Sequence, residues 1–177
     1  MDQNQPFSFH VRPAQPTDIP ALMRLKRQLA ESENALHAVR ATEAHWRRDG
    51  FGPNAGFCAF VAESGDRVIG MATCSKRVIT GWNGPVVFLQ DMFVESDRRQ
   101  CGVARALMTR VAAYAREIGS PIVEFTVRSD NPAALAFYRS AGCMSLPECL
   151  TYVLAGPALA ELAARAAPDD SDLALAG

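Results

Sequence analysis

Two arginines followed by two small residues form the segment of the sequence best suited to chemistry. Arg98 and Arg99 come directly after an apolar run, and Gly102 and Ala104 open a stretch with helical periodicity. The first turn of a helix presents backbone N–H groups and the positive end of a dipole, which attract anions. Small residues keep Cβ atoms away from those amides. The segment predicts a phosphate site, but a helix that simply begins beside solvated arginines would show the same short pattern.

The elements around this segment read as strand, helix and strand. An apolar run at residues 86–94 predicts a strand that leads into the arginine segment, and residues 122–127 predict the next strand. Between them, apolar residues recur every three or four positions, as on one face of a helix: Val103, Leu107, Val111, Tyr114 and Ile118. The phosphate site is thus expected at a strand-to-helix turn.

The first half of the chain predicts further elements of the same kind. Residues 7–12 predict a strand. Thr17 is expected to cap a first helix, and Thr42 is expected to cap a second helix that stops at Gly50. The first helix carries its apolar face on Ile19, Leu22, Leu25 and Leu29. Residues 57–62 and 68–74 predict a hairpin around a turn at 63–66.

The C-terminal third predicts one more helix and one more strand. Asn131 and Pro132 open a helix to about Ser140, Gly142 stops it, and residues 149–154 predict a last strand. We expect one α/β domain over residues 9–155, a short helix within 156–167 and a disordered tail over 168–177.

Composition limits the classes of function. The 177 residues suit one domain, with 49% hydrophobic residues and a formal net charge of −1. No basic block predicts nucleic-acid binding, and no apolar stretch is long enough to predict a membrane span. The five cysteines are odd in number and match no metal-ligand spacing. We expect reduced thiols, a cytoplasmic location, and neither metal, nucleic acid nor membrane as a partner.

Two motifs in this order resemble the GNAT superfamily of N-acetyltransferases. They are Arg99-Gln-Cys-Gly102-Val-Ala104 before the long helix and Asn131-x-x-Ala134-x-x-Phe137-Tyr138-x-x-x-Gly142 after the next strand. The resemblance implies a GNAT-like fold, with a mixed, mostly antiparallel sheet flanked by helices. It also implies acetyl-coenzyme A as cosubstrate, bound by Met92, Phe93, Val94, Arg99, Gln100, Cys101, Gly102, Val103, Ala104, Asn131, Ala134 and Tyr138.

Other segments look like the diamine (spermidine/spermine) N-acetyltransferase branch. They are residues 89–94, residues 49–52, residues 61–63 and Glu33. The likeness extends over about residues 9–155 and implies a homodimer with substrate bound near the subunit boundary. Where that branch has two further carboxylates, this sequence has Gln90 and Thr80. A smaller amine, such as a diamine, a lysine analogue or an amino acid, is therefore as well supported as a polyamine.

Acetyl transfer to an amine makes three chemical demands. An alkylamine has a pKa of roughly 10, so a base must remove its proton, and with Gln90 in place of a glutamate the candidates are Asp91 and Glu33 acting through water. A backbone N–H at Phe93 or Val94 could stabilise the oxyanion. Tyr138 matches the family's general acid for the thiolate.

Each of these side chains also has a structural interpretation. Asp91 within an apolar strand could serve an ion pair or contact the amine, and Glu33 could lie on a solvated face. Trp82 could be a packing anchor or a wall of the amine site, and Tyr138 could be a core aromatic. Three hypotheses follow: a small-molecule N-acetyltransferase that works by direct transfer, a protein lysine or N-terminal acetyltransferase, and a coenzyme A binding module that has lost catalysis.

Overall fold

The computed structural model describes residues 7–81 and 84–165. The chain divides into two compact units, Met1–Leu135 and Ala136–Gly177, and each is described here by itself. The first unit contains the sheet and the strand-to-helix turn.

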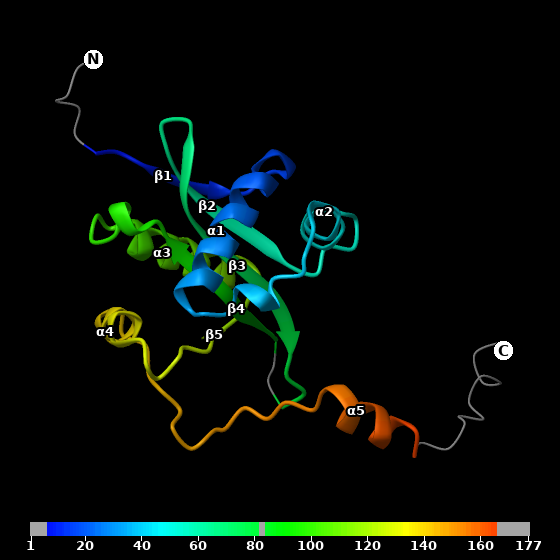
Figure 1. Ribbon diagram of the computed structural model, residues 1–177. Helices are drawn as coiled ribbons and strands as arrows, with labels where there is room; N and C mark the ends of the chain where they lie inside the picture. The colour runs from blue at the N-terminus through cyan, green and yellow to red at the C-terminus, as the bar shows by residue number, and fades with distance from the viewer. Residues whose placement is uncertain (1–6, 82–83, 166–177) are drawn as a thin grey trace. The chain divides into compact units, whose positions relative to one another are not determined.

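Five strands form one sheet in the order β1-β2-β3-β4-β5 (Figure 1). All neighbours are antiparallel except β4 and β5, which are parallel. This confirms the predicted mixed, mostly antiparallel sheet. The strands are β1 (His10–Pro13), β2 (Cys58–Ser64), β3 (Arg67–Val78), β4 (Pro85–Val94) and β5 (Val123–Glu124).

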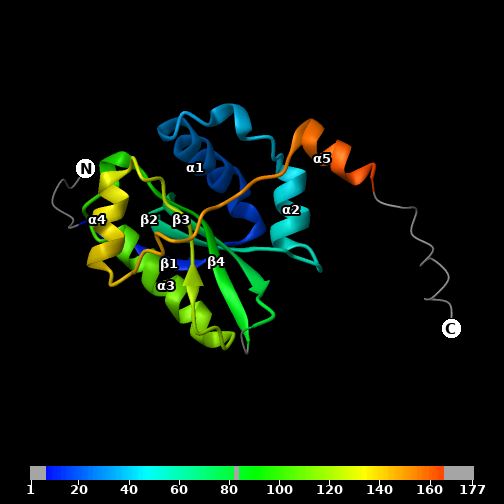
Figure 2. The same ribbon diagram turned by 90° about the horizontal axis from the view of Figure 1, so that it is seen from below.

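Helices cover both faces of this sheet. In the first unit, α1 (Ile19–Ser32) and α2 (Glu43–Phe51) lie on one face and α3 (Val103–Glu117) lies on the other (Figure 2). Because α3 connects two adjacent parallel strands, β4, α3 and β5 form a βαβ unit. The remaining helical segments are η1 (Pro16–Asp18), η2 (Leu36–Ala38), η3 (Ser96–Arg98), α4 (Pro132–Ser140) and α5 (Gly156–Ala163).

The two faces of the sheet carry separate hydrophobic cores. The α3 side buries Leu107 and Val111 against strand residues such as Phe60 and Leu89. The α1 side is formed by Ile19, Leu22, Met23, Leu25, Trp46, Ala59, Val61, Val68, Met71 and Phe93. The apolar spacing in the sequence correctly predicted which face of α1 and of α3 is buried.

Several predicted boundaries are wrong. Thr17 does not cap α1, because a short 3-10 turn precedes that helix and Asp18 occupies the N-cap position. The predicted cap at Thr42 is confirmed, since its Oγ1 accepts a hydrogen bond from the His45 N–H at 3.4 Å. The strand expected at 122–127 is only two residues long.

The strand expected at residues 149–154 does not form. This segment has no regular secondary structure, and its side chains are exposed. A strand requires a partner for its backbone N–H and C=O groups. No such pairing is present among the described residues.

A β-bulge interrupts the pairing of β3 with β4. Thr73 pairs with Asp91, whereas the next residue of β3, Cys74, pairs with Leu89, so Gln90 is an extra residue in β4. Leu89 and Met92 both pack on the α3 side of the sheet, although three positions separate them. In a regular strand such residues would point to opposite faces. The bulge therefore reverses the alternation of side chains halfway along β4.

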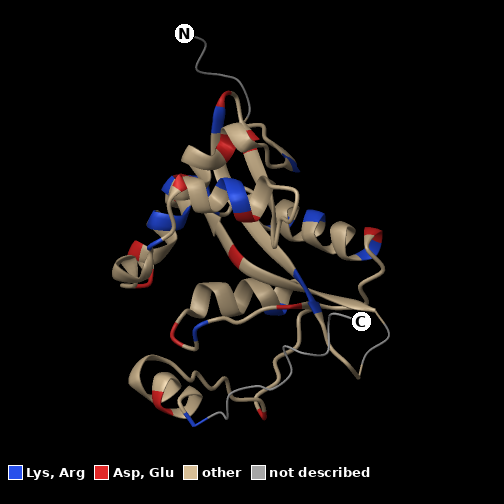
Figure 3. Cartoon of the chain, turned by 90° about the vertical axis from the view of Figure 1, so that its right-hand side faces the viewer, with Lys and Arg blue, Asp and Glu red and all other residues tan. Residues whose placement is uncertain are grey.

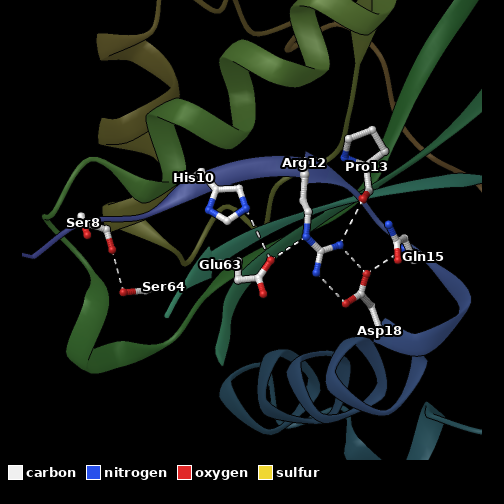
Figure 4. A network of polar contacts seen from close by, with 8 residues as sticks. All are labelled: Ser8, His10, Arg12, Pro13, Gln15, Asp18, Glu63 and Ser64. Atoms are coloured by element: carbon white, nitrogen blue, oxygen red, sulfur yellow. Dashed lines mark hydrogen bonds and ion pairs between the residues drawn. The ribbon is translucent and has the colours of Figure 1, made fainter. Parts of the chain in front are cut away.

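An ion-pair network joins β1, β2 and the start of α1 (Figure 4). The Arg12 guanidinium donates to both oxygens of Asp18, at 2.7 and 2.9 Å, and to Glu63 at 2.6 Å. Asp18 also accepts from the Gln15 N–H at 2.7 Å. The hydrogen bonds from Arg12 lower the pKa of Asp18 below its usual 3.8. The network fixes the entry of the chain into α1.

Replacing Asp18 by asparagine is expected to reduce the free energy of unfolding by about 2 kcal/mol at pH 7, since it weakens charge-assisted hydrogen bonds to a buried group. A carboxyl group with a lower pKa in the folded than in the unfolded state stabilises the fold at pH values above its unfolded pKa. That contribution is lost as the pH falls through its folded pKa. The difference between wild type and Asp18→Asn should therefore shrink below pH 3.8. Urea unfolding across pH tests this, with the exposed Asp66→Asn as control.

Candidate active site

The turn between β4 and α3 has the backbone geometry expected of an anion-binding loop. After η3, Gln100 and Gly102 both have positive φ, at 60° and 82°. Gly102 occupies the N-cap of α3 in a left-handed conformation. A Cβ atom built on Gly102 would meet no heavy atom within 4 Å, so the space over this residue is open. The first N–H groups of α3, from Val103 and Ala104, have no acceptor within the helix and present its positive end.

Arg99 is held beside this turn. Its Nε donates to the Val94 carbonyl at 3.2 Å, and its guanidinium lies 5.6 Å from the ring centroid of Phe93. Arg98 instead contacts Asp97 at 3.4 Å and lies over Phe7 at 5.3 Å. Arg99 is therefore the arginine that is fixed at the end of β4, and Cys101 beside it is exposed.

The edge of β4 that faces β5 is open beyond its first half. The two strands pair only at Val87–Val123 and Phe88–Glu124 among the described residues. The side chains of Met92 and Val94 pack in the core on the α3 side, and Phe93 packs on the α1 side. Since all three side chains serve the core, a ligand along this edge would contact the backbone. Unpaired strand edges bind extended chains in this way.

Asp91 lies on the α1 side of the sheet, where it forms an ion pair. Lys26 Nζ is 2.5 Å from Asp91 Oδ1, and Thr73 Oγ1 donates to Oδ2 at 3.3 Å. Both carboxylate oxygens are therefore engaged, which favours the structural interpretation of this residue. Gln90, the bulge residue, is exposed.

Two other predicted residues occupy helix ends. Glu33 is the C-cap of α1, and it contributes to raising the pKa of Arg128, although the hydrogen bond from Arg128 to Asp130 contributes most. Asn131 Oδ1 accepts the Ala134 N–H at 3.0 Å and so caps α4. Glu33 thus lies near the segment that leads from β5 to α4.

Tyr138 belongs to the second unit, on α4. Its ring makes an edge contact with Phe137, with ring centroids 5.3 Å apart. Burial raises the pKa of Tyr138 to about 12. The phenol therefore stays protonated at neutral pH, as a general acid must. Trp82 lies outside the described residues.

A pocket that the sequence did not indicate lies between α1 and the end of β4. It has a volume of about 550 Å³, and its lining includes Gln28, Phe93, Glu95, Ser96 and Arg99. Gln28 Oε1 and Glu95 Oε2 are buried and have no hydrogen-bond partner among the described residues. Buried acceptors without partners cost free energy. Both residues line the pocket, but these two oxygens are sealed from solvent and therefore offer no acceptor at its surface.

Glu95 anchors the start of the loop. It is 3% exposed and accepts hydrogen bonds from Arg24 of α1 and, at 3.0 Å, from Arg67 of β3. Its own N–H donates to the Ile69 carbonyl at 3.0 Å. A carboxylate directly after an apolar strand is the signal in the sequence that could have identified this residue.

Removing the charge of Glu95 should destabilise the fold, because two arginines would lose their anionic partner. We expect Glu95→Gln to reduce the free energy of unfolding by about 3 kcal/mol. Chemical denaturation measures the change. Glu31→Gln, an exposed substitution on α1, is the control and should change stability by less than about 0.5 kcal/mol. Equal stability of the two variants would contradict the anchoring role.

Charged residues are interspersed along the described chain (Figure 3). No cluster of three or more His, Cys, Asp or Glu side chains with the geometry of a metal site occurs within residues 7–81 and 84–165. Over the same residues, no helix combines the length and apolar character of a membrane span.

The chain belongs to the acetyltransferase (GNAT) family, whose model matches residues 21–143. The resemblance expected from the two motifs is thereby confirmed, and with it the enzyme class, an N-acetyltransferase.

The curated relatives include members of the predicted branch. The chain is 31% identical over 169 residues to the thialysine N-epsilon-acetyltransferase of Mus musculus. The match covers 89% of this chain and 99% of the mouse protein. It is also 31% identical over 153 residues to spermidine/spermine N(1)-acetyltransferase-like protein 1 of Homo sapiens. That match covers 82% of this chain but only 22% of the human protein.

Solved structures share the fold. An integron cassette protein from the mobile metagenome of V. cholerae has a TM-score of 0.74 at 23% identity, covering 89% of this chain and 99% of that one. An aminoglycoside acetyltransferase from a soil metagenomic sample, in complex with sisomicin, has a TM-score of 0.70 at 18% identity. The match covers 83% of this chain and 97% of that one.

Proposed function

We propose that this protein transfers the acetyl group of acetyl-coenzyme A directly to the primary amine of a small molecule, and that residues 9–155 form its acetyltransferase domain. The observation that carries the proposal is the junction of β4 and α3. An open strand edge leads there into a left-handed glycine at the first turn of a helix, with Arg99 fixed beside it. This arrangement suits a cosubstrate that has an extended arm and a pyrophosphate.

The backbone of Met92, Phe93 and Val94 would hold the extended arm of the cosubstrate. The turn from Arg99 to Ala104 would hold its phosphates, through N–H groups and one guanidinium. A backbone N–H at Phe93 or Val94 would stabilise negative charge on the reacting carbonyl oxygen. Asn131 and Ala134 would support the cosubstrate from the start of α4, and Tyr138 would protonate the leaving thiolate.

The amine acceptor would be bound by Glu33, Trp82, Gln90 and Asp91. Of the two candidate bases, the engagement of Asp91 by Lys26 and Thr73 favours Glu33, because protonating Asp91 would weaken both contacts. The thialysine and polyamine activities in the names of the relatives support a small aliphatic amine.

The test is the initial rate of coenzyme A release from acetyl-coenzyme A with putrescine, spermidine, thialysine, free amino acids and a lysine peptide. Saturable turnover of a small amine supports the proposal. Turnover of the peptide alone would instead identify a protein acetyltransferase. Coenzyme A binding without turnover of any acceptor would support a binding module.

We also propose that the protein is a cytoplasmic homodimer. In the second unit, the segment around residues 149–154 exposes large apolar side chains, which support pairing with another chain: Leu150 at 75%, Tyr152 at 87% and Val153 at 82%. The odd number of cysteines supports a reducing compartment. Light scattering coupled to size exclusion should give twice the monomer mass, and a triple replacement of Leu150, Tyr152 and Val153 by serine should give the monomer.

A further inference from the structure

Two free cysteines lie directly opposite each other on neighbouring strands. Cys58 of β2 and Cys74 of β3 are register partners in an antiparallel pair. Residues in such positions have Cα atoms about 4.5 or 5.5 Å apart, and both values fall within the range that a disulfide spans. Their side chains point to the same face, toward α3. The backbone therefore already brings the two sulfur atoms within reach of a bond.

The two thiols differ in access and in reactivity. Cys74 is fully buried, whereas Cys58 is partly exposed. A hydrogen bond with Cys74 is the largest cause that lowers the pKa of Cys58 to about 7, and the positive charge of Arg110 adds to it. The same pairing and burial raise the pKa of Cys74. Cys58 is thus the nucleophile of the pair, and Cys74 is a protonated partner beside it.

We propose that Cys58 and Cys74 form a reversible two-electron redox site that responds to peroxide and slows acetyl transfer when oxidised. The Cys58 thiolate attacks one oxygen of hydrogen peroxide, the O–O bond breaks, and hydroxide leaves. The Cys74 sulfur then attacks the resulting sulfenic acid, an S–S bond forms, and water leaves with the thiol proton. In total, two thiols lose two electrons and two protons, and one peroxide becomes two waters.

The position of Cys74 explains why oxidation would affect activity. Cys74 pairs on its other side with Leu89, at the step where β3 and β4 change register around Gln90. Opposed Cβ atoms in a sheet are about 4.5–5.5 Å apart, whereas a disulfide needs about 3.5–4.5 Å. Closing the bond therefore pulls β3 toward β2 beside the bulge. Strained disulfides of this kind are readily reduced, so the change is reversible.

The effect on turnover rests on the proposed function, whereas the disulfide itself does not. The first measurement is therefore chemical. The reduced full-length protein is treated with hydrogen peroxide, alkylated under denaturing conditions and mapped by peptide mass spectrometry. We expect a Cys58–Cys74 cross-link that dithiothreitol removes. Overoxidation of Cys58 without a cross-link, or two thiols that remain alkylatable, would overturn the proposal.

The second measurement is turnover of the best amine before and after peroxide. We expect a loss of roughly tenfold, because small displacements at a reacting centre are costly, with recovery after reduction. Cys58→Ser should keep its activity in peroxide, and Cys149→Ser, which retains the pair, should lose activity like wild type. A cross-link without loss of turnover would overturn the regulatory role. An inactive reduced protein would count against the proposed function, and the mass measurement would still decide the thiol site.

Discussion

Tyr138→Phe is expected to lower kcat at least about tenfold while the affinity for coenzyme A stays unchanged. The substitution removes one hydroxyl and keeps the ring that contacts Phe137. The measurements are steady-state kinetics with the best amine and calorimetric titration with coenzyme A. Phe137→Tyr, which adds a phenol one position away, should not restore the rate in the Tyr138→Phe background. Unchanged turnover would remove Tyr138 from the mechanism.

The pKa of Tyr138 adds a test by pH. A phenol is a proton donor only below its pKa, and burial moves that value from 10 to about 12. Tyr138 should therefore remain a donor through pH 10, and the alkaline fall in kcat that it causes should lie above the ordinary tyrosine range. In Tyr138→Phe this part of the pH profile should be absent. A wild-type rate that already falls with a tyrosine-like pKa near 10 would contradict the assignment.

Gly102→Val is expected to raise the Kd for acetyl-coenzyme A at least about tenfold, because a branched side chain would fill the open space over the first amides of α3. The structure adds a second effect that the sequence did not reveal. At a φ of 82° a β-branched residue is strained, so stability should also fall, by about 1–2 kcal/mol.

A control separates these two effects. Gly119, just past the C-terminal end of α3, has a φ of 72° and likewise has no heavy atom within 4 Å of a built Cβ. Gly119→Val should lose similar stability and yet bind acetyl-coenzyme A normally. If both variants lose affinity equally, strain rather than occlusion is responsible and the pyrophosphate assignment of the loop is wrong.

Local patterns predicted the parts of the fold that depend on local interactions. The spacing from Val103 to Ile118 identified α3 and its buried face, because a helix forms its hydrogen bonds within itself. Gly102 is predicted at the start of α3 because it places no Cβ atom over the first amides, whereas its positive φ is known only from the structure. The family resemblance then supplied roles for these residues, which no periodicity could give.

The features that the sequence did not predict depend on distant partners. The bulge at Gln90 exists only in the register of β4 with β3, and no signal within residues 86–94 specifies that register. Glu95 acquires its anchoring role from Arg24 and Arg67, which lie 71 and 28 positions earlier in the chain. The segment 149–154 has the composition of a strand, but a strand requires a neighbour.

The bulge in β4 also divides the strand into two segments whose side chains alternate in opposite phase. Before Gln90, odd-numbered residues such as Leu89 contribute to the core under α3, and after it the even-numbered Met92 and Val94 do so. Deleting Gln90 itself would leave a regular strand in which Leu89, Met92 and Val94 still face α3, because these residues would then occupy alternate positions. Substitution at Gln90 should likewise leave both cores intact, because this residue is exposed. Evolution or design could therefore change the polarity of the proposed amine site at this one position without repacking either core.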